Sequence, residues 1–254
     1  MLSTTTFGDA PGPALLIAHG LYGSGRNWGV IAKRLADSRR VITVDMRNHG
    51  HSFWDADHSY PALAADLGAV IDHLGGPMDV VGHSMGGKAA MMLALDQPDR
   101  VRSLVVGDIA PVGYSHSQMQ FITAMQGVDL TRVTRRSDAQ AQLAALGVEP
   151  ALCSFFTQSL DVAGQRWHMN LDALAENMPA ILDFPQINSA YHGPTLFLSG
   201  GQSDYVTAAH RPTIRGLFPA ARFTKIPQAG HWLHAEQPRA FEQTVRAFLD
   251  ATAA

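Results

Sequence analysis

One serine in the sequence lies in a pattern that can turn a hydroxyl group into a nucleophile. Ser84 is the centre of "GHSMG", with Gly82 and Gly86 two residues away on either side, between an apolar run and an alanine- and methionine-rich stretch. A strand that turns sharply into a helix here lifts the hydroxyl above a sheet, and the glycines leave room for the turn. Because "GxSxG" alone also fits an ordinary turn serine, the surrounding residues must support this interpretation.

A serine nucleophile needs a histidine base and an acidic group that orients the base. "QAGHWLHAEQP" contains two histidines. His231 directly follows a predicted strand and is the favoured base, whereas His234 is expected to enter a helix or to pack beneath the loop. Two carboxylates follow predicted strands: Asp108 ends "SLVVGD", and Asp204 lies in "LSGGQSDYV". In many hydrolases of this architecture the acid lies three residues after a strand-end glycine. Counting from Gly200 reaches Ser203, whereas counting from Gly201 reaches Asp204, so the sequence leaves the acid open between Asp108 and Asp204.

The same chemistry requires backbone N–H groups that bind the negative oxygen of the tetrahedral intermediate. Met85, the residue after the serine, offers one at the positive end of a predicted helix. Leu21, in the glycine-rich loop "AHGLYGSG", offers the other. This loop lacks the pattern of a phosphate-binding loop or a dinucleotide fingerprint, so we expect no nucleotide cofactor. His49 and His51 have no accompanying cysteine or carboxylate pattern, so we expect no metal.

Short apolar runs alternate with helical patterns, which indicates the α/β class with a mostly parallel sheet flanked by helices. The predicted strands are residues 14–20, 39–45, 78–84, 101–108, 193–200 and 221–227. The predicted helices are residues 27–37, 60–76, 85–97, 207–218 and 238–251.

The strand pattern stops for about 80 residues after Pro111, which is far too long for a structureless loop in a compact domain. The pieces of this stretch look helical. Ser137 is a candidate N-cap of one helix with Gly147 just past its end, and Asn170 is a candidate N-cap of another. We therefore expect an α/β core of residues 1–111 and 193–254, with a helical cap, residues 112–192, inserted into it.

Composition excludes several classes of protein. Of 254 residues 46% are hydrophobic and 16% are charged, enough for a large core, and the net charge of −3 with scattered basic residues argues against nucleic acid as a partner. No apolar run approaches the roughly 20 residues that span a bilayer. The N-terminus lacks a signal-peptide pattern, so we expect a soluble cytoplasmic protein. The lone Cys153 is expected to be a small buried hydrophobe.

Six motifs along the chain carry a resemblance to a known superfamily. They are "HGLYGSGRNW", "VDMRNHGHS", "GHSMGGKAAM", "DIAPV", "YHGPTLFLSGGQS" and "AGHWLHAEQP". Together they are similar to the α/β-hydrolase superfamily, and within it to the YbfF esterase group, which includes the ABHD11-like proteins. The resemblance runs from about residue 14 to the C-terminus. It implies that the acid follows the strand after the nucleophile helix, which favours Asp108. The segment before Ala14 is short, so an N-terminal strand is expected to be missing or abbreviated.

The residues and the resemblance predict a cofactor-independent serine carboxylesterase. Ser84, His231 and Asp108 would cleave a small-molecule ester of short to medium acyl chain through an acyl-enzyme. An acyl-CoA thioesterase, a lactonase and a carbon–carbon bond hydrolase are alternatives on the same three residues. Outside enzymes, the alternative is a ligand receptor on a hydrolase scaffold, because a fold does not fix function. The sequence indicates no oligomeric state.

Overall fold

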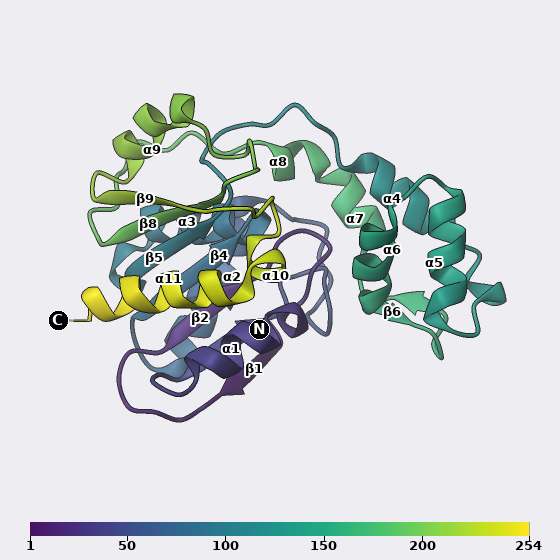
Figure 1. Ribbon diagram of the computed structural model, residues 1–254, viewed down its shortest axis with the longest axis horizontal. Coiled ribbons are helices and arrows are strands. Elements are labelled where there is room, and N and C mark those ends of the chain that lie inside the picture. Colours follow the sequence, from purple (N-terminus) through teal and green to yellow (C-terminus); the bar gives the residue numbers. More distant parts are fainter. Residues whose placement is uncertain (254) are drawn as a thin grey trace.

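A seven-stranded sheet forms the centre of the computed structural model, which describes residues 1–253 (Figure 1). The strand order is β1-β3-β2-β4-β5-β8-β9, and only β1 runs antiparallel to its neighbour. The strands are β1 (Thr4–Phe7), β2 (Leu15–Ala18), β3 (Val41–Val44), β4 (Met78–His83), β5 (Val101–Gly107), β8 (Thr195–Gly200) and β9 (Ala221–Ile226). The predicted α/β class with a mostly parallel sheet is confirmed, and the short segment before Ala14 contributes the four-residue strand β1.

Helices cover both faces of the sheet. They are α1 (Gly29–Leu35), α2 (Tyr60–Leu74), α3 (Met85–Asp96), α9 (Arg211–Leu217), α10 (Leu233–Glu236) and α11 (Pro238–Ala251). Alternate strand residues join two buried clusters: Leu16 and Val80 pack on the side of α2 and α3, and Leu15 and Val81 pack on the side of α1 and α11. A sheet that is buried on both faces requires continuous apolar strands, which explains why the central strands read as uninterrupted hydrophobic runs.

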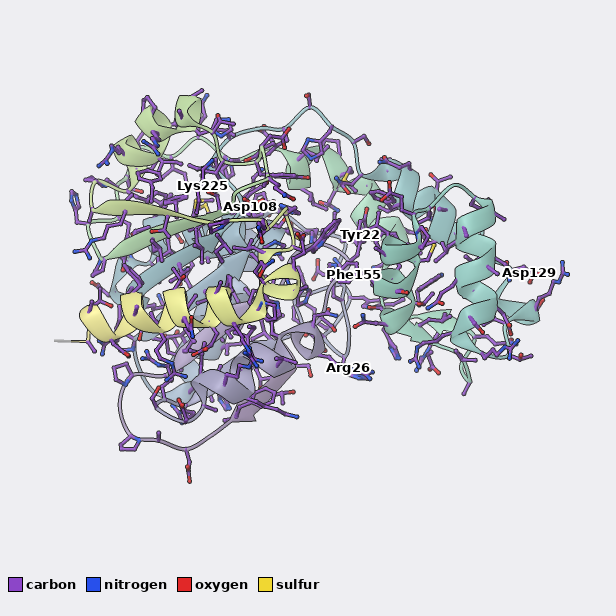
Figure 2. All side chains as sticks on the ribbon, in the orientation of Figure 1. Tyr22, Arg26, Asp108, Asp129, Phe155 and Lys225 are labelled. Carbon is purple, nitrogen blue, oxygen red and sulfur yellow. The ribbon has the colours of Figure 1, made fainter. Side chains whose placement is uncertain are left out.

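The chain between β5 and β8 forms a group of helices that stands beside the sheet (Figure 1). Its elements are α4 (Met119–Gln126), α5 (Arg136–Ala145), α6 (Pro150–Phe156), β6 (Leu160–Asp161), β7 (Arg166–Trp167), α7 (Leu171–Glu176) and α8 (Met178–Leu182). We call residues 112–192 the inserted segment. Figure 2 shows Tyr22 and Phe155 where this segment meets the sheet domain, with Asp129 at its outer end. Short 3-10 turns complete the chain: η1 (Gly25–Trp28), η2 (Pro98–Arg100), η3 (Leu130–Arg132), η4 (Thr157–Ser159) and η5 (Ala208–His210).

Two of the three helix boundaries predicted in the inserted segment are correct. Asn170 caps α7 by accepting the N–H of Ala173 at 3.3 Å, and Gly147 follows α5 with φ of +86°. The prediction of Ser137 as an N-cap was wrong, because this residue lies inside α5. The carboxylate of Asp138 instead reaches back and accepts the N–H of Arg135 at 3.1 Å, so the helix begins earlier than expected.

Cys153 is buried in the inserted segment, as predicted. Within residues 1–253, no helix is both long enough and apolar enough to cross a bilayer.

Candidate active site

Ser84 lies on a sharp turn between β4 and α3. Its backbone has φ of +53° and ψ of −121°, a conformation that L-residues rarely adopt. The flanking glycines make this turn possible. A Cβ atom at Gly82 would lie 2.3 Å from the carbonyl oxygen of Gly86, and one at Gly86 would lie 2.4 Å from the carbonyl oxygen of His19. The predicted passage from strand to turn to helix is therefore present, and any side chain at either glycine would disrupt it.

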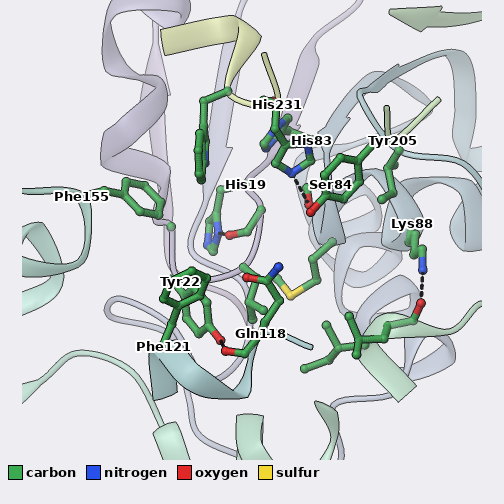
Figure 3. A pocket seen from close by; sticks show the side chains of 18 of the residues that line it. His19, Tyr22, His83, Ser84, Lys88, Gln118, Phe121, Phe155, Tyr205 and His231 are labelled. Carbon is green, nitrogen blue, oxygen red and sulfur yellow. Dashed lines mark hydrogen bonds between the residues drawn. The ribbon is translucent and has the colours of Figure 1, made fainter. Parts of the chain in front are cut away.

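The structure brings Ser84, His231 and Asp108 into one chain of hydrogen bonds. The Nε2 atom of His231 lies 3.1 Å from Oγ of Ser84 (Figure 3). Its Nδ1 atom lies 2.8 Å from Oδ2 of Asp108. Because a carboxylate only accepts, Nδ1 carries the proton and Nε2 presents its lone pair to the hydroxyl. Asp108 is fully buried, whereas 16% of the His231 side chain is exposed. The imidazole therefore lies between a carboxylate that solvent does not reach and a pocket that substrate can enter.

Asp108 is held by groups at the end of β8. Its Oδ1 atom accepts the N–H of Gly200 at 2.9 Å, and its Oδ2 atom accepts the hydroxyl of Ser203. Ser203 is the third residue after Gly200, one of the two positions that the glycine count suggested for an acid. Asp204, the other carboxylate left open by spacing, is exposed on the same loop. Asp108 is thus the carboxylate that contacts His231, and the loop after β8 supplies a hydroxyl to it.

The imidazole of His231 is fixed from two further directions. The ring of Tyr205 stacks on it with centroids 3.9 Å apart, and Nε2–H of His83 donates to its backbone carbonyl at 2.8 Å. Burial holds the pKa of His83 well below its usual range, which keeps this donor neutral. His234 instead stacks on Trp28 inside the core, and burial lowers its pKa to about 3. Of these three histidines, His231 is the one within hydrogen-bond distance of the Ser84 hydroxyl.

The two amides expected to bind an oxyanion border the same pocket as the serine. Leu21 and Met85 both line it together with Ser84. The loop that carries Leu21 lies directly against the serine, since a Cβ atom at Gly20 would be 3.2 Å from Cβ of Ser84. Within residues 1–253, neither amide donates a hydrogen bond to another protein group, so both N–H groups are free to bind an oxygen in the pocket.

Two buried histidines form hydrogen bonds with the backbone of this loop. His19 accepts the N–H of Met46 at Nε2, 2.9 Å away, and donates from Nδ1 to the carbonyl of Gly20 at 2.8 Å. His49 accepts the N–H of Tyr22 at Nε2, 3.2 Å away. Burial lowers the pKa of both histidines, so both stay neutral, as their acceptor roles require.

The pocket has a volume of about 360 Å³. Figure 3 shows Ser84 and His231 between Phe155 of the inserted segment on one side and Lys88 on the other. Most of its wall is aromatic or aliphatic, which suits an apolar ligand with one polar group at the serine. In the part of the chain that the structure describes, no three histidine, cysteine, aspartate or glutamate side chains are grouped to hold a metal ion.

Comparison with known proteins places this chain in a family. A family model described as the alpha/beta hydrolase fold matches residues 13–238. The chain belongs to the α/β-hydrolase fold family. A diacylglycerol lipase of Mus musculus, "sn-1-specific diacylglycerol lipase ABHD11", is 44% identical over 253 residues, which cover 95% of this chain and 82% of that protein. "Esterase YbfF" of Escherichia coli (strain K12) is 37% identical over 238 residues, which cover 93% of this chain and 92% of that protein.

A solved structure agrees with these relatives. "Marine microorganism esterase" superposes on this α/β hydrolase with a TM-score of 0.92 at 37% identity, covering 97% of this chain and 98% of that chain. The predicted resemblance to the YbfF and ABHD11 group is therefore confirmed.

Sequence reasoning missed three contributors to the geometry of this α/β hydrolase: Ser203, Tyr205 and His83. The glycine count did point to the position of Ser203. An acid was expected there, however, and not a hydroxyl that binds the acid. For His83, the sequence contained no indication of a hydrogen bond to the loop that carries His231. Nothing in the sequence indicated that Tyr205 would stack on a histidine 26 residues away in the chain, because loops brought together by a fold leave no local pattern.

Lys88 joins α3 to the end of α8, the last helix of the inserted segment. Only 1% of this residue is exposed, and its Nζ donates to the carbonyls of Leu182 at 2.9 Å and Asp183 at 2.7 Å. The ammonium also faces the rings of Tyr60 and Tyr114. Since carbonyls at the end of α8 have no partner inside the helix, Lys88 supplies their donors. Burial lowers its pKa to about 7.

This buried lysine predicts a pH-dependent stability difference. Between the folded pKa of about 7 and the ordinary value of 10.5, the unfolded chain binds the lysine proton and the folded protein does not. The free energy of unfolding therefore rises with pH across this window. We expect the wild type to gain stability relative to Lys88→Met when urea unfolding is measured at about pH 6 and then at about pH 9. A difference that stays constant or falls with pH would contradict the assignment.

Proposed function

We propose that this ester-hydrolysing enzyme is a serine carboxylesterase that acts on small-molecule esters of short to medium acyl chain through an acyl-enzyme. Ser84 is the nucleophile, His231 the general base and acid, and Asp108 the group that orients the imidazole. The continuous hydrogen-bond chain from Asp108 through His231 to Ser84 carries the proposal. A hydroxyl whose proton faces the lone pair of an oriented imidazole is the arrangement that acyl transfer requires.

The reaction follows from this geometry in two halves. Oγ of Ser84 attacks the acyl carbonyl while Nε2 of His231 takes its proton, and the N–H groups of Leu21 and Met85 bind the oxyanion. When the intermediate collapses, the ester C–O bond breaks and Nε2 gives the proton to the leaving alcohol. Water then attacks the acyl-enzyme with His231 again as base, which releases the carboxylic acid and restores the serine hydroxyl.

We further propose that residues 112–192 act as a cap on the core of residues 1–111 and 193–254. Side chains of this segment, including Phe121 and Phe155, form part of the pocket wall. They are apolar, so they favour the acyl chain over charged groups. A pocket of about 360 Å³ is at the small end of ligand sites, which supports short to medium chains as substrates. The names esterase and diacylglycerol lipase given to the relatives agree with an ester substrate.

Two measurements on the purified protein test the proposal. A fluorophosphonate probe should label the protein rapidly, with the added mass on the peptide that contains Ser84. The protein should also turn over p-nitrophenyl acetate, butyrate and octanoate many times per molecule, with a decline for palmitate. Slow release of a single equivalent of p-nitrophenol would instead indicate a ligand receptor. Faster cleavage of the matching acyl-CoA thioesters would indicate a thioesterase.

A further inference from the structure

Tyr22 has a backbone conformation that its side chain disfavours. Its φ of +65° lies in the left-handed region, which costs free energy for a bulky residue. The N–H of Gly23 donates to the carbonyl of Gly20 at 3.0 Å, so Leu21 and Tyr22 are the central residues of a tight turn. A positive φ at the second central position is typical of a type II turn, where glycine or asparagine is usual. A tyrosine there must be held by its surroundings.

The core holds Tyr22 through its backbone. Its N–H donates to Nε2 of His49 at 3.2 Å, and the residue is only 3% exposed. An ordinary negative φ would flip the peptide group between Leu21 and Tyr22, as in a type I turn, and would turn this N–H away from His49. The hydrogen bond to His49 therefore belongs to the strained arrangement.

The inserted segment holds the same residue through its side chain. The hydroxyl of Tyr22 donates to the carbonyl of Gln118 at 3.0 Å (Figure 3). Its ring meets Phe156 edge-on with centroids 5.3 Å apart, and Phe121 edge-on with centroids 6.5 Å apart. Gln118 directly precedes α4 and Phe156 ends α6, so two parts of the inserted segment fix one side chain of the core.

Simple packing does not account for the backbone conformation of Tyr22. A tyrosine that only fills space needs no left-handed backbone, and a glycine at this turn position would adopt it without strain. The strain is located directly after Leu21, whose N–H is part of the proposed oxyanion hole. We propose that Tyr22 is a positioning residue, through which the seating of the inserted segment on the core sets the direction of the Leu21 N–H. This inference rests on the proposed function, because it assigns the oxyanion a partner in Leu21.

The test separates stabilisation of the transition state from binding of the substrate. Tyr22→Phe keeps the ring and loses the bond to Gln118, whereas Tyr22→Ala loses every contact with the inserted segment. Since removal of one oxyanion donor costs about 10²–10³-fold in kcat, we expect about tenfold for Tyr22→Phe and about 10²-fold for Tyr22→Ala with p-nitrophenyl butyrate. KM should change by less than about twofold, because the substrate carbonyl oxygen interacts only weakly with the oxyanion hole before attack.

A boronic acid gives a second readout. Phenylboronic acid forms a tetrahedral adduct on a serine hydroxyl and places an oxygen where the oxyanion would lie. Its inhibition constant should rise in each variant by the same factor as kcat falls. Tyr191→Phe is the matched control, because it also removes a buried tyrosine hydroxyl from a backbone carbonyl, that of Val101 at 2.9 Å, and it lies outside the pocket. It should lower the melting temperature without changing kcat.

The outcomes distinguish this inference from the proposed function. A wild type without turnover or fluorophosphonate labelling would overturn the proposed function itself. With an active wild type, three results would overturn the role of Tyr22: unchanged kcat and boronate affinity in both variants, a change in KM alone, or a loss of stability alone like that of Tyr191→Phe. Circular dichroism of Tyr22→Phe, the milder variant, establishes that the comparison is made on folded protein.

Discussion

Ser84→Ala is expected to lower kcat for p-nitrophenyl butyrate by about 10⁴-fold or more, because the residual rate then comes from binding and the oxyanion hole alone. The fold should persist for two reasons. Alanine at φ of +53° is no more strained than serine, and within residues 1–253 the serine side chain bonds only to His231. Steady-state kinetics on purified protein, together with a thermal melt, checks both statements.

Ser117→Ala is the matched control for this substitution. Ser117 also lines the pocket, but its hydroxyl accepts the N–H of Met119 and, within residues 1–253, forms no hydrogen bond with a histidine. Its effect on kcat should be small. Near-normal turnover by Ser84→Ala, or loss of fluorophosphonate labelling in Ser117→Ala alone, would move the nucleophile elsewhere and end the present assignment.

Asp108→Asn is expected to lower kcat by about 10⁴-fold through the proton position on His231. The N–H of Gly200 donates to one carboxylate oxygen, so the asparagine oxygen is expected at that place. The amide NH₂ then faces the imidazole and donates to Nδ1. This moves the histidine proton to Nε2. The protonated Nε2 then faces the hydroxyl of Ser84 and cannot accept its proton. The shape of the site is retained while its base is disabled.

Asp204→Asn separates this effect from a general effect of removing a carboxylate near the site. Asp204 is exposed and belongs to the loop that also carries Ser203. Measured in parallel with the same ester, its kcat should lie close to that of the wild type. If Asp204→Asn were the inactive variant and Asp108→Asn the active one, the chain of hydrogen bonds described above would not be the one used in the reaction.

The sheet was predictable because its strands are short apolar runs that alternate with helical patterns, and burial on both faces demands that composition. The turn at Ser84 was predictable for a related reason. Only glycine fits at positions 82 and 86, and the sequence displays both. Local physical requirements of this kind leave a local trace in the sequence.

The partner of His231 was not predictable from spacing, because it depends on how three separate loops meet above the sheet. Asp108 and Asp204 both follow strands, and only the fold shows that Ser203 accompanies Asp108. The conformation of Tyr22 was not predictable from the sequence for a different reason. A positive φ is expected of glycine or asparagine, so a tyrosine in that conformation becomes visible only in the structure.

The inserted segment leaves the core directly after β5 and returns at β8, and these two strands are neighbours in the sheet. Because β5 and β8 are parallel, the segment leaves at the carboxyl end of β5, beside Asp108, and the chain runs back to the opposite edge of the sheet before it enters β8. If residues 112–192 act as the proposed cap, we expect an exchange of this segment between related enzymes to change which molecules reach the hydroxyl while the sheet stays intact. Such a chimera would still need a carbonyl and an aromatic edge for Tyr22, so grafts that lack them should bind new esters yet hydrolyse them slowly.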